Sequence, residues 1–256
     1  MTLEEIQAET AIDLSPHGHS YLNPYNGCMM GCPYCYWLSF PGWENRVQVK
    51  MNIVSLLEDY LSNRMDDGYL YLGSVCDPFM ELEREYRLTG KCLELIRRYR
   101  IPLVITTSAA SNVILDYIKI LKSMESRVIV VAELSRIPFL EAMNGGGRHT
   151  GIDHANYLRR NGLEIWATLA PVLPGITDLD CVLGTLDIKI PLYIDRLRCG
   201  PDDLQANRIL EWISRDYPGL FYRYEDIIKK QDWKYFQDIL KQGSYSRRIK
   251  TFPFQL

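Results

Sequence analysis

The segment RVIVVAEL, Arg127–Leu134, gives the clearest indication of the fold. Its unbroken run of β-branched and aliphatic residues is typical of a strand buried on both faces, as the central strands of parallel sheets are. Strand-like segments also occur at Tyr69–Ser74, Pro102–Thr106, Glu164–Ala170 and Ile190–Leu197. Helical segments lie between them, at Leu88–Arg98, Val113–Leu121, near Asp153–Asn161 and at Leu179–Leu186.

This alternation predicts an α/β fold built from βαβ units around a parallel sheet. About six units are present if the segment before Asn26 supplies the first strand, and six units make an incomplete barrel or an open sheet. Ligands of such folds bind at the C-terminal ends of the strands, so we expect functional residues directly after each strand. Residues 204–256 are expected to form two or three helices that pack on the same domain as residues 1–203.

The composition is that of a globular protein. The chain has 256 residues, of which 47% are hydrophobic and 24% charged, which excludes a disordered chain, a coiled coil and a collagen-like repeat. The formal net charge is −3, so the basic excess of proteins that bind nucleic-acid phosphates is absent overall, although a local basic patch stays open. We see neither a secretory signal nor an apolar run of membrane-spanning length, and we expect a cytoplasmic protein with no membrane partner.

Three cysteines stand close together in Cys28-Met-Met-Gly-Cys32-Pro-Tyr-Cys35. Gly27 and Gly31 allow the tight turns that would bring the three thiols to one metal centre. In a reducing compartment, clustered cysteines indicate metal ligands more often than disulfides. Three thiols would leave one iron of a cubane cluster open for a substrate or cofactor. A structural zinc site is the alternative, and His17 or His19 would supply its fourth ligand.

The CxxxCxxC spacing with an aromatic residue before the third cysteine resembles the radical SAM superfamily. The longer string Asn23-Pro-Tyr-Asn-Gly-Cys28 to Tyr36 is similar to the spore photoproduct lyase-like branch of that superfamily. Further segments resemble this branch in the same order: Gly73-Ser-Val-Cys-Asp-Pro-Phe79, Glu85-Tyr-Arg-Leu-Thr89 and Ala170-Pro-Val-Leu-Pro-Gly-Ile-Thr-Asp178. The resemblance covers about residues 21–197.

The resemblance implies a partial (β/α)6 TIM-like barrel with a C-terminal helical extension. It also implies a [4Fe-4S] cluster held by Cys28, Cys32 and Cys35, with S-adenosyl-L-methionine (SAM) on the open iron. Such enzymes cleave SAM reductively to a 5′-deoxyadenosyl radical, with an electron from an external donor of the flavodoxin or ferredoxin type. A small molecule or a peptide is the expected substrate, and the subclass (lyase, oxidoreductase or transferase) stays open.

The resemblance further implies a set of cofactor-binding residues at the strand ends. Relatives often have a lysine that reaches the SAM carboxylate where this chain has Thr107, so that contact is missing or comes from elsewhere, for example from Arg148. The expected cofactor-binding residues are Tyr34, Ser74, Asp77, Thr107, Ser108, Glu133, Ser135, Arg148 and Val172.

Two thiols outside the cysteine motif are candidate hydrogen donors, Cys76 beside Asp77 and Cys199 after the last strand. The donor cysteine of spore photoproduct lyase would align with Ser74, so its role does not transfer directly. Trp37 and Trp43 would cover the cluster, line the substrate pocket or simply pack together.

Two other functions remain open. One is a lyase that repairs a DNA photolesion, which would need a basic groove. The other is a non-catalytic iron–sulfur binding module, which would never cleave SAM.

Overall fold

The sheet that organises the protein is mostly parallel. The computed structural model describes residues 2–15, 18–40, 43, 46–135, 150–242 and 248–251. Eight strands follow the order β11-β10-β9-β8-β7-β6-β3-β2, and every pair is parallel except β2–β3. The bounds are β2 Ile12–Leu14, β3 Ser20–Leu22, β6 Leu70–Leu72, β7 Leu103–Thr107, β8 Val128–Glu133, β9 Glu164–Leu169, β10 Leu192–Ile194 and β11 Ile249–Thr251.

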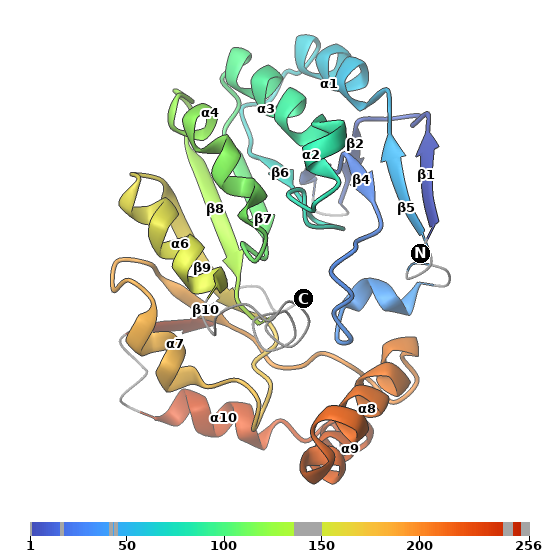
Figure 1. Ribbon diagram of the computed structural model, residues 1–256, viewed down its shortest axis with the longest axis vertical. Coiled ribbons are helices and arrows are strands. Elements are labelled where there is room, and N and C mark those ends of the chain that lie inside the picture. Colours follow the sequence, from blue (N-terminus) through green and yellow to red (C-terminus); the bar gives the residue numbers. More distant parts are fainter. Residues whose placement is uncertain are drawn as a thin grey trace.

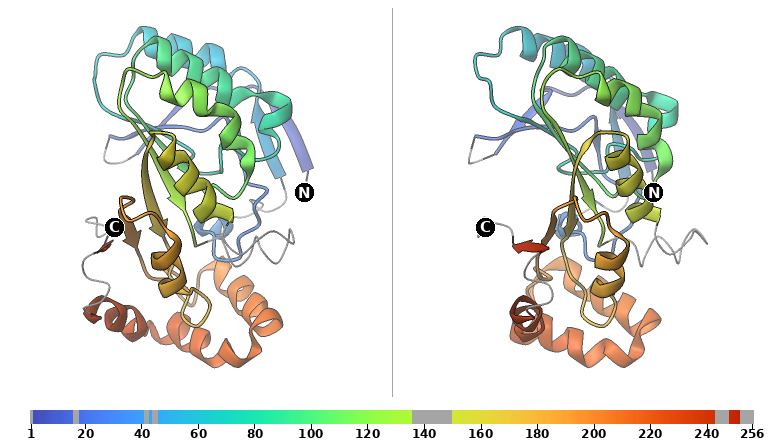
Figure 2. Two further views of the ribbon diagram at one scale, coloured as in Figure 1. Left: turned by 60° about the vertical axis from the view of Figure 1, so that its left-hand side comes forward. Right: turned by 90° about the vertical axis from the view of Figure 1, so that its left-hand side faces the viewer.

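The six strands β3 and β6–β10 form the predicted partial barrel, with helices between successive strands (Figure 1). These helices are α2 Glu83–Tyr86, α3 Leu88–Arg98, α4 Ile118–Lys122, α6 Thr150–Arg160 and α7 Leu179–Thr185. In Figure 2 the green α4, yellow α6 and orange α7 lie together on one face of the sheet. The α/β prediction and the first strand before Asn26 are therefore confirmed.

The helix-covered face of the sheet forms the main core. Thr107, Ala132, Ala167 and Leu192 are register partners across β7–β10, and all of them are buried. The opposite face carries the alternate residues, which are only half-buried, such as Tyr71, Val131 and Trp166. We call this second surface the inner face, because it is the concave side of a partial barrel.

Several elements were not predicted from the sequence. A small sheet of order β1-β5-β4 contains β1 Thr2–Ile6, β4 Tyr25–Asn26 and β5 Arg46–Lys50. Helix α1 Ile53–Ser62 follows β5, and its buried residues Ile53, Leu57 and Leu61 recur at the spacing of one helix face. The predicted helix Val113–Leu121 begins as a 3₁₀ helix, η3 Asn112–Tyr117, and continues as α4.

The C-terminal part is helical, as predicted, and lies at the end of the barrel where the cysteine motif is found (Figure 1). It comprises α8 Leu204–Asp216, η4 Pro218–Leu220, α9 Phe221–Lys230 and α10 Lys234–Lys241. A second buried cluster joins α8 and α9 to the cysteine motif, and it contains Cys32, Tyr34, Ile209, Trp212 and Tyr224. None of the described helices combines the length and the apolar character that a membrane span requires.

Candidate cluster and cofactor site

The three cysteines of the motif line one cavity of about 220 Å³ between β4 and the short 3₁₀ helix η1, Tyr36–Ser39. The cavity also receives residues from the segment after β6 and from α8. Its lining consists of Cys28, Met30, Gly31, Cys32, Cys35, Trp37, Leu38, Trp43, Ser74, Val75, Cys76 and Arg208. Three segments far apart in the sequence therefore form this cavity.

Glycine shapes the cysteine loop, as the sequence predicts. Gly27 has a φ of 103° and Gly31 a φ of 63°, values that residues other than glycine rarely adopt. A Cβ atom at Gly27 would lie 2.3 Å from the Arg46 carbonyl oxygen of β5. The loop can therefore follow β5 this closely only with glycine before Cys28.

The loop is fixed to the barrel by contacts on both sides of the cysteines. Before them, the Tyr25 hydroxyl donates to buried Glu83 over 2.5 Å. Within the cysteine motif, the Met29 N–H contacts the Met80 sulfur at 3.2 Å. After the motif, the Trp37 indole N–H donates to the Ser74 carbonyl at 3.2 Å. The loop is thus held against the segment that follows β6.

Tyr34 connects the loop to two further parts of the fold. Its hydroxyl donates to the Ser135 carbonyl over 2.7 Å, just after β8, and its ring centroid lies 6.0 Å from that of Trp212 on α8. The side chain is only 8% exposed. Tyr34 therefore lies between the barrel end and the C-terminal helices.

Asp77 joins the ends of β6 and β7. Its buried carboxylate accepts hydrogen bonds from the Thr107 hydroxyl at 2.9 Å, the Ser108 N–H at 2.8 Å and the Ser108 hydroxyl at 2.5 Å. It also accepts the Phe79 N–H at 3.0 Å. Three residues expected at the cofactor are thus brought together, and they bind one another. Ser74 is held separately, by Asn23 of the segment after β3 at 3.0 Å.

Glu133 joins the ends of β8 and β9, as Asp77 joins those of β6 and β7. Its carboxylate accepts hydrogen bonds from the Ser135 hydroxyl at 2.5 Å and N–H at 2.9 Å, and from the Thr168 hydroxyl at 2.9 Å. Val172 follows β9 and is buried, with its N–H donating to the Asp195 carbonyl at 2.8 Å. It lies beside α10, because its carbonyl accepts the Tyr235 hydroxyl at 3.4 Å.

The two candidate hydrogen donors lie in different places. Cys76 is buried in the lining of the cavity, and its thiol donates to the Tyr25 carbonyl at 3.2 Å. Burial, and then the neighbouring Cys28, raise its pKa well above the usual value for a thiol. Cys199 instead packs in the buried cluster with α8 and α9, where burial raises its pKa to about 11. Both groups therefore stay protonated at neutral pH.

The donor set of the cavity fits a cluster. Among the described residues, no group of three or more His, Cys, Asp or Glu side chains is close enough to hold a single metal ion. Cys28, Cys32 and Cys35 line one cavity, and three such cysteines can hold a cubane cluster with each thiolate on a different iron. Cys32 is buried, and Cys28 and Cys35 are half-buried.

Two residues of the sequence analysis, Arg148 and His17, lie outside the described residues. Trp37 and Trp43 are described, and both line the cavity with their rings stacked at a centroid distance of 5.1 Å. Sequence reasoning missed Arg208 and Glu83. Neither belongs to a local motif: only the tertiary structure brings Arg208 to the cavity and Glu83 to Tyr25, ahead of the cysteines.

The chain has relatives among known sequences. No family model matches the chain. An uncharacterized protein of Methanocaldococcus jannaschii is 25% identical over 231 residues, which cover 87% of this chain and 85% of that protein. An uncharacterized protein of Mycobacterium tuberculosis is 24% identical over 256 residues, covering 90% of this chain and 74% of that protein.

Two solved structures have a similar fold. Spore photoproduct lyase, complexed with dinucleoside spore photoproduct, has a TM-score of 0.58 at 16% identity, and the match covers 84% of this chain and 66% of that one. Streptococcus suis SuiB, bound to S-adenosylmethionine, has a TM-score of 0.54 at 14% identity, over 92% of this chain and 50% of that one. This chain therefore spans about two thirds of the first and half of the second. The fold implied by the sequence resemblance is confirmed.

Proposed function

We propose that this chain is a radical SAM enzyme of the spore photoproduct lyase-like branch, with a [4Fe-4S] cluster on Cys28, Cys32 and Cys35. The observation that carries the proposal is the shared cavity, which these three thiols line at the C-terminal end of a parallel partial barrel. Ligands of parallel α/β folds bind at that end. A spore photoproduct lyase variant with bound AdoMet and SuiB bound to S-adenosylmethionine share the fold.

When bound, the cluster would supply one electron to cleave a carbon–sulfur bond of SAM, and 5′-deoxyadenosine would be the nucleoside product. The protein's own residues would prepare the site for it. Asp77 and Glu133 hold neighbouring strand ends at fixed spacing through hydrogen bonds from Thr107, Ser108, Ser135 and Thr168. Trp37 and Trp43 add an apolar wall, which limits the access of water to a reactive intermediate.

The experiment that tests this function is anaerobic reconstitution with iron and sulfide, followed by dithionite and SAM. We expect about four irons per chain and 5′-deoxyadenosine as the nucleoside product, identified by mass spectrometry. Methylthioadenosine would show that a different carbon–sulfur bond is cleaved. A protein that holds iron but never cleaves SAM, even with candidate substrates, would favour the non-catalytic binding module.

Cys76 is the better placed of the two candidate hydrogen donors, because it lines the cavity and Cys199 packs among the C-terminal helices. We expect the Cys76→Ala protein to retain its cluster and SAM cleavage. It should lose the substrate-derived product whose formation needs a hydrogen atom from the thiol. The Cys199→Ala protein is the matched control and should retain all three. Unchanged product from the Cys76→Ala protein would remove the thiol from the mechanism.

The inner face offers a surface for the substrate. It presents pairs of half-buried aromatic rings, Tyr21 with Tyr71 at 5.5 Å and Trp166 with Tyr193 at 5.4 Å between centroids. Such rings suit a peptide or a small molecule with flat or apolar groups. SuiB has been solved bound to its precursor peptide SuiA, which makes a peptide substrate reasonable for this fold.

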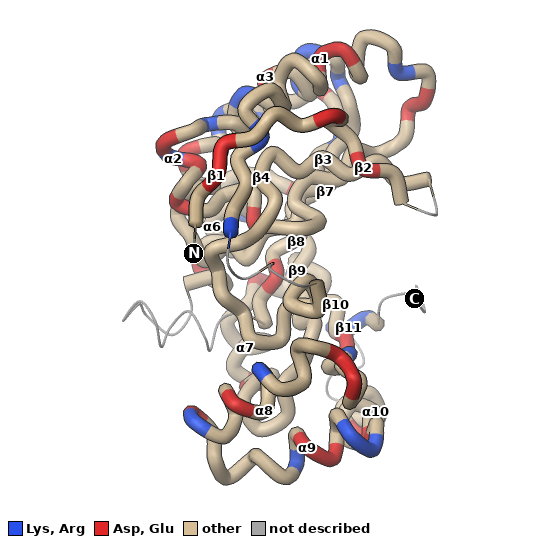
Figure 3. The backbone as a smooth tube through the Cα atoms, turned by 90° about the vertical axis from the view of Figure 1, so that its right-hand side faces the viewer, with Lys and Arg blue, Asp and Glu red and all other residues tan. Residues whose placement is uncertain are grey.

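A lyase for a DNA photolesion is the second candidate, because the fold is shared with spore photoproduct lyase bound to a dinucleoside spore photoproduct. The charge distribution favours it less. Blue and red segments are interspersed along α1–α3 and α8–α10 in Figure 3, and the net charge is −3. Binding of a lesion-bearing oligonucleotide at physiological salt, compared with its undamaged twin, separates the two functions.

A further inference from the structure

Arg208 brings a positive charge from the C-terminal helices to the cavity of the three cysteines. It belongs to α8, is half-buried, and lines the same cavity as Cys32 and Cys35. The other described residues of this lining are cysteines or carry no ionisable group. Arg208 therefore lines the cavity in which the proposed function puts a cluster and SAM.

The place of Arg208 is fixed by its neighbours on α8. One turn earlier, the side-chain amide of buried Gln205 donates to the Arg198 carbonyl at 3.0 Å, which ties the start of the helix to the segment after β10. On the following turn, Ile209 and Trp212 pack in the same buried cluster as Cys32 and Tyr34. Helix α8 thus rests on the cysteine loop (Figure 1), and Arg208 of this helix lines the cavity beside it.

The end of β7 supplies no cation to this site. Thr107 stands where relatives often have a lysine, and its hydroxyl donates to Asp77 at 2.9 Å. The carboxylate of Asp77, which directly follows the cavity-lining Cys76, adds negative charge near this cavity. A bound SAM brings a further carboxylate, and a partly buried carboxylate needs a cationic or hydrogen-bonding partner.

We propose that Arg208 binds the carboxylate of the methionine moiety of SAM, in place of a lysine at the end of β7. The planar guanidinium can donate two parallel hydrogen bonds to a carboxylate, which makes arginine well suited to this contact. The C-terminal helices are then part of the cofactor site. This inference rests on the proposed function, because it needs a protein that binds SAM.

The test compares two ligands on reconstituted protein by isothermal titration calorimetry, SAM itself and its decarboxylated analogue. We expect the Arg208→Gln protein to bind SAM at least about tenfold more weakly than the wild type, since it loses a charge-assisted pair. Its affinity for decarboxylated SAM should change less than about twofold. Arg208→Lys, which keeps the charge but not the two-pronged geometry, should fall between them.

Arg215→Gln is the matched control, because Arg215 lies on the same helix and pairs with Asp216 at 2.7 Å on the exposed surface. It should bind both ligands as the wild type does. Equal SAM affinity in the Arg208→Gln and wild-type proteins would overturn the inference. Equal weakening of both ligands would also overturn it, because the charge would then act through the cluster. A wild-type protein that binds no SAM would instead contradict the proposed function.

Discussion

The Cys32→Ala protein is expected to contain less than about a tenth of the iron of the reconstituted wild type and to produce no 5′-deoxyadenosine. Cys32 is the middle ligand of the proposed cluster and the most deeply buried of the three, so no other thiol of the motif can move into its place. Iron and sulfide analysis, with the absorbance of the cluster near 400 nm, measures the loss. Cys28→Ala and Cys35→Ala should behave in the same way.

Cys181→Ala is the matched control, since Cys181 is a half-buried cysteine on α7 and does not line the cavity. It should retain full iron and full SAM cleavage. The proposed cluster would be wrong if the Cys32→Ala protein kept its iron and its turnover. Binding of one zinc per chain by the wild type, with no cluster after anaerobic reconstitution, would favour the structural zinc site instead.

The Glu83→Ala protein is expected to lose at least about 3 kcal/mol of unfolding free energy. Glu83 is fully buried, and its carboxylate accepts four hydrogen bonds: from Tyr25 at 2.5 Å, Tyr117 at 2.6 Å, the Thr89 N–H at 3.0 Å and the Gly90 N–H at 2.9 Å. Removing it would take the acceptor away from all four donors, three of which belong to buried residues. Denaturation of the apoprotein with urea measures the change.

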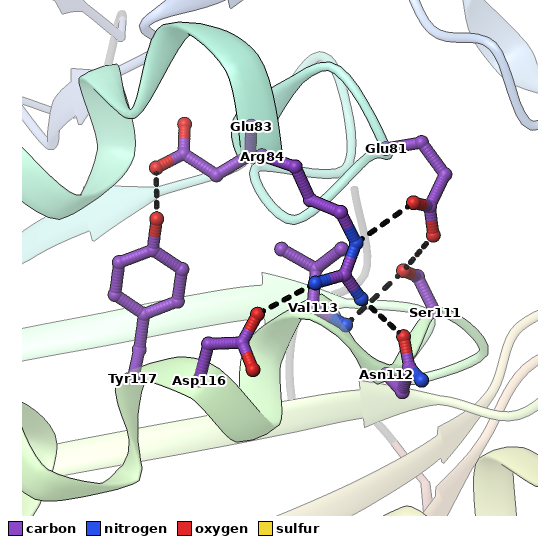
Figure 4. Close-up of polar contacts among 8 residues, drawn as sticks. All are labelled: Glu81, Glu83, Arg84, Ser111, Asn112, Val113, Asp116 and Tyr117. Atoms are coloured by element: carbon purple, nitrogen blue, oxygen red, sulfur yellow. Dashed lines mark hydrogen bonds and ion pairs between the residues drawn. The ribbon is translucent and has the colours of Figure 1, made fainter.

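Glu81→Ala is the matched control for this substitution. Glu81 lies two residues away and also accepts hydrogen bonds, from Arg84 and Ser111, but its side chain is 66% exposed (Figure 4). Exposed pairs of this kind contribute about 1 kcal/mol or less, so its loss should be small. If the two variants are equally stable, the Glu83 network does not hold the fold together.

The Glu83 network also holds the start of the cysteine loop, because Tyr25 lies one short turn before Cys28. Burial, and then the negative charge of Glu83, raise the pKa of Tyr25, so the hydroxyl stays a donor at neutral pH. The Tyr25→Phe protein keeps three of the four hydrogen bonds to Glu83. It should therefore fold, and it should lose less stability than the Glu83→Ala protein.

The sequence by itself determined the parallel sheet and the cysteine loop. Both are local features. The apolar run of β8 can be recognised from its own residues. Cys28, Cys32 and Cys35 lie within one short segment, which Gly27 and Gly31 allow to turn. Hydrophobic periodicity and backbone freedom act over a few residues, so they can be read along the chain.

Only the tertiary structure decided which distant groups meet at the site. Asp77 is a predicted cofactor-binding residue, and the folded chain shows that its carboxylate accepts hydrogen bonds from the hydroxyls of Thr107 and Ser108. Arg208 and Glu83 carry no local pattern, because a single charged residue on a helix is ordinary in sequence. Their roles depend on burial and on packing between segments that are far apart in the sequence. Helix α8 packs against the cysteine loop, and Glu83 lies between Tyr25 and Tyr117.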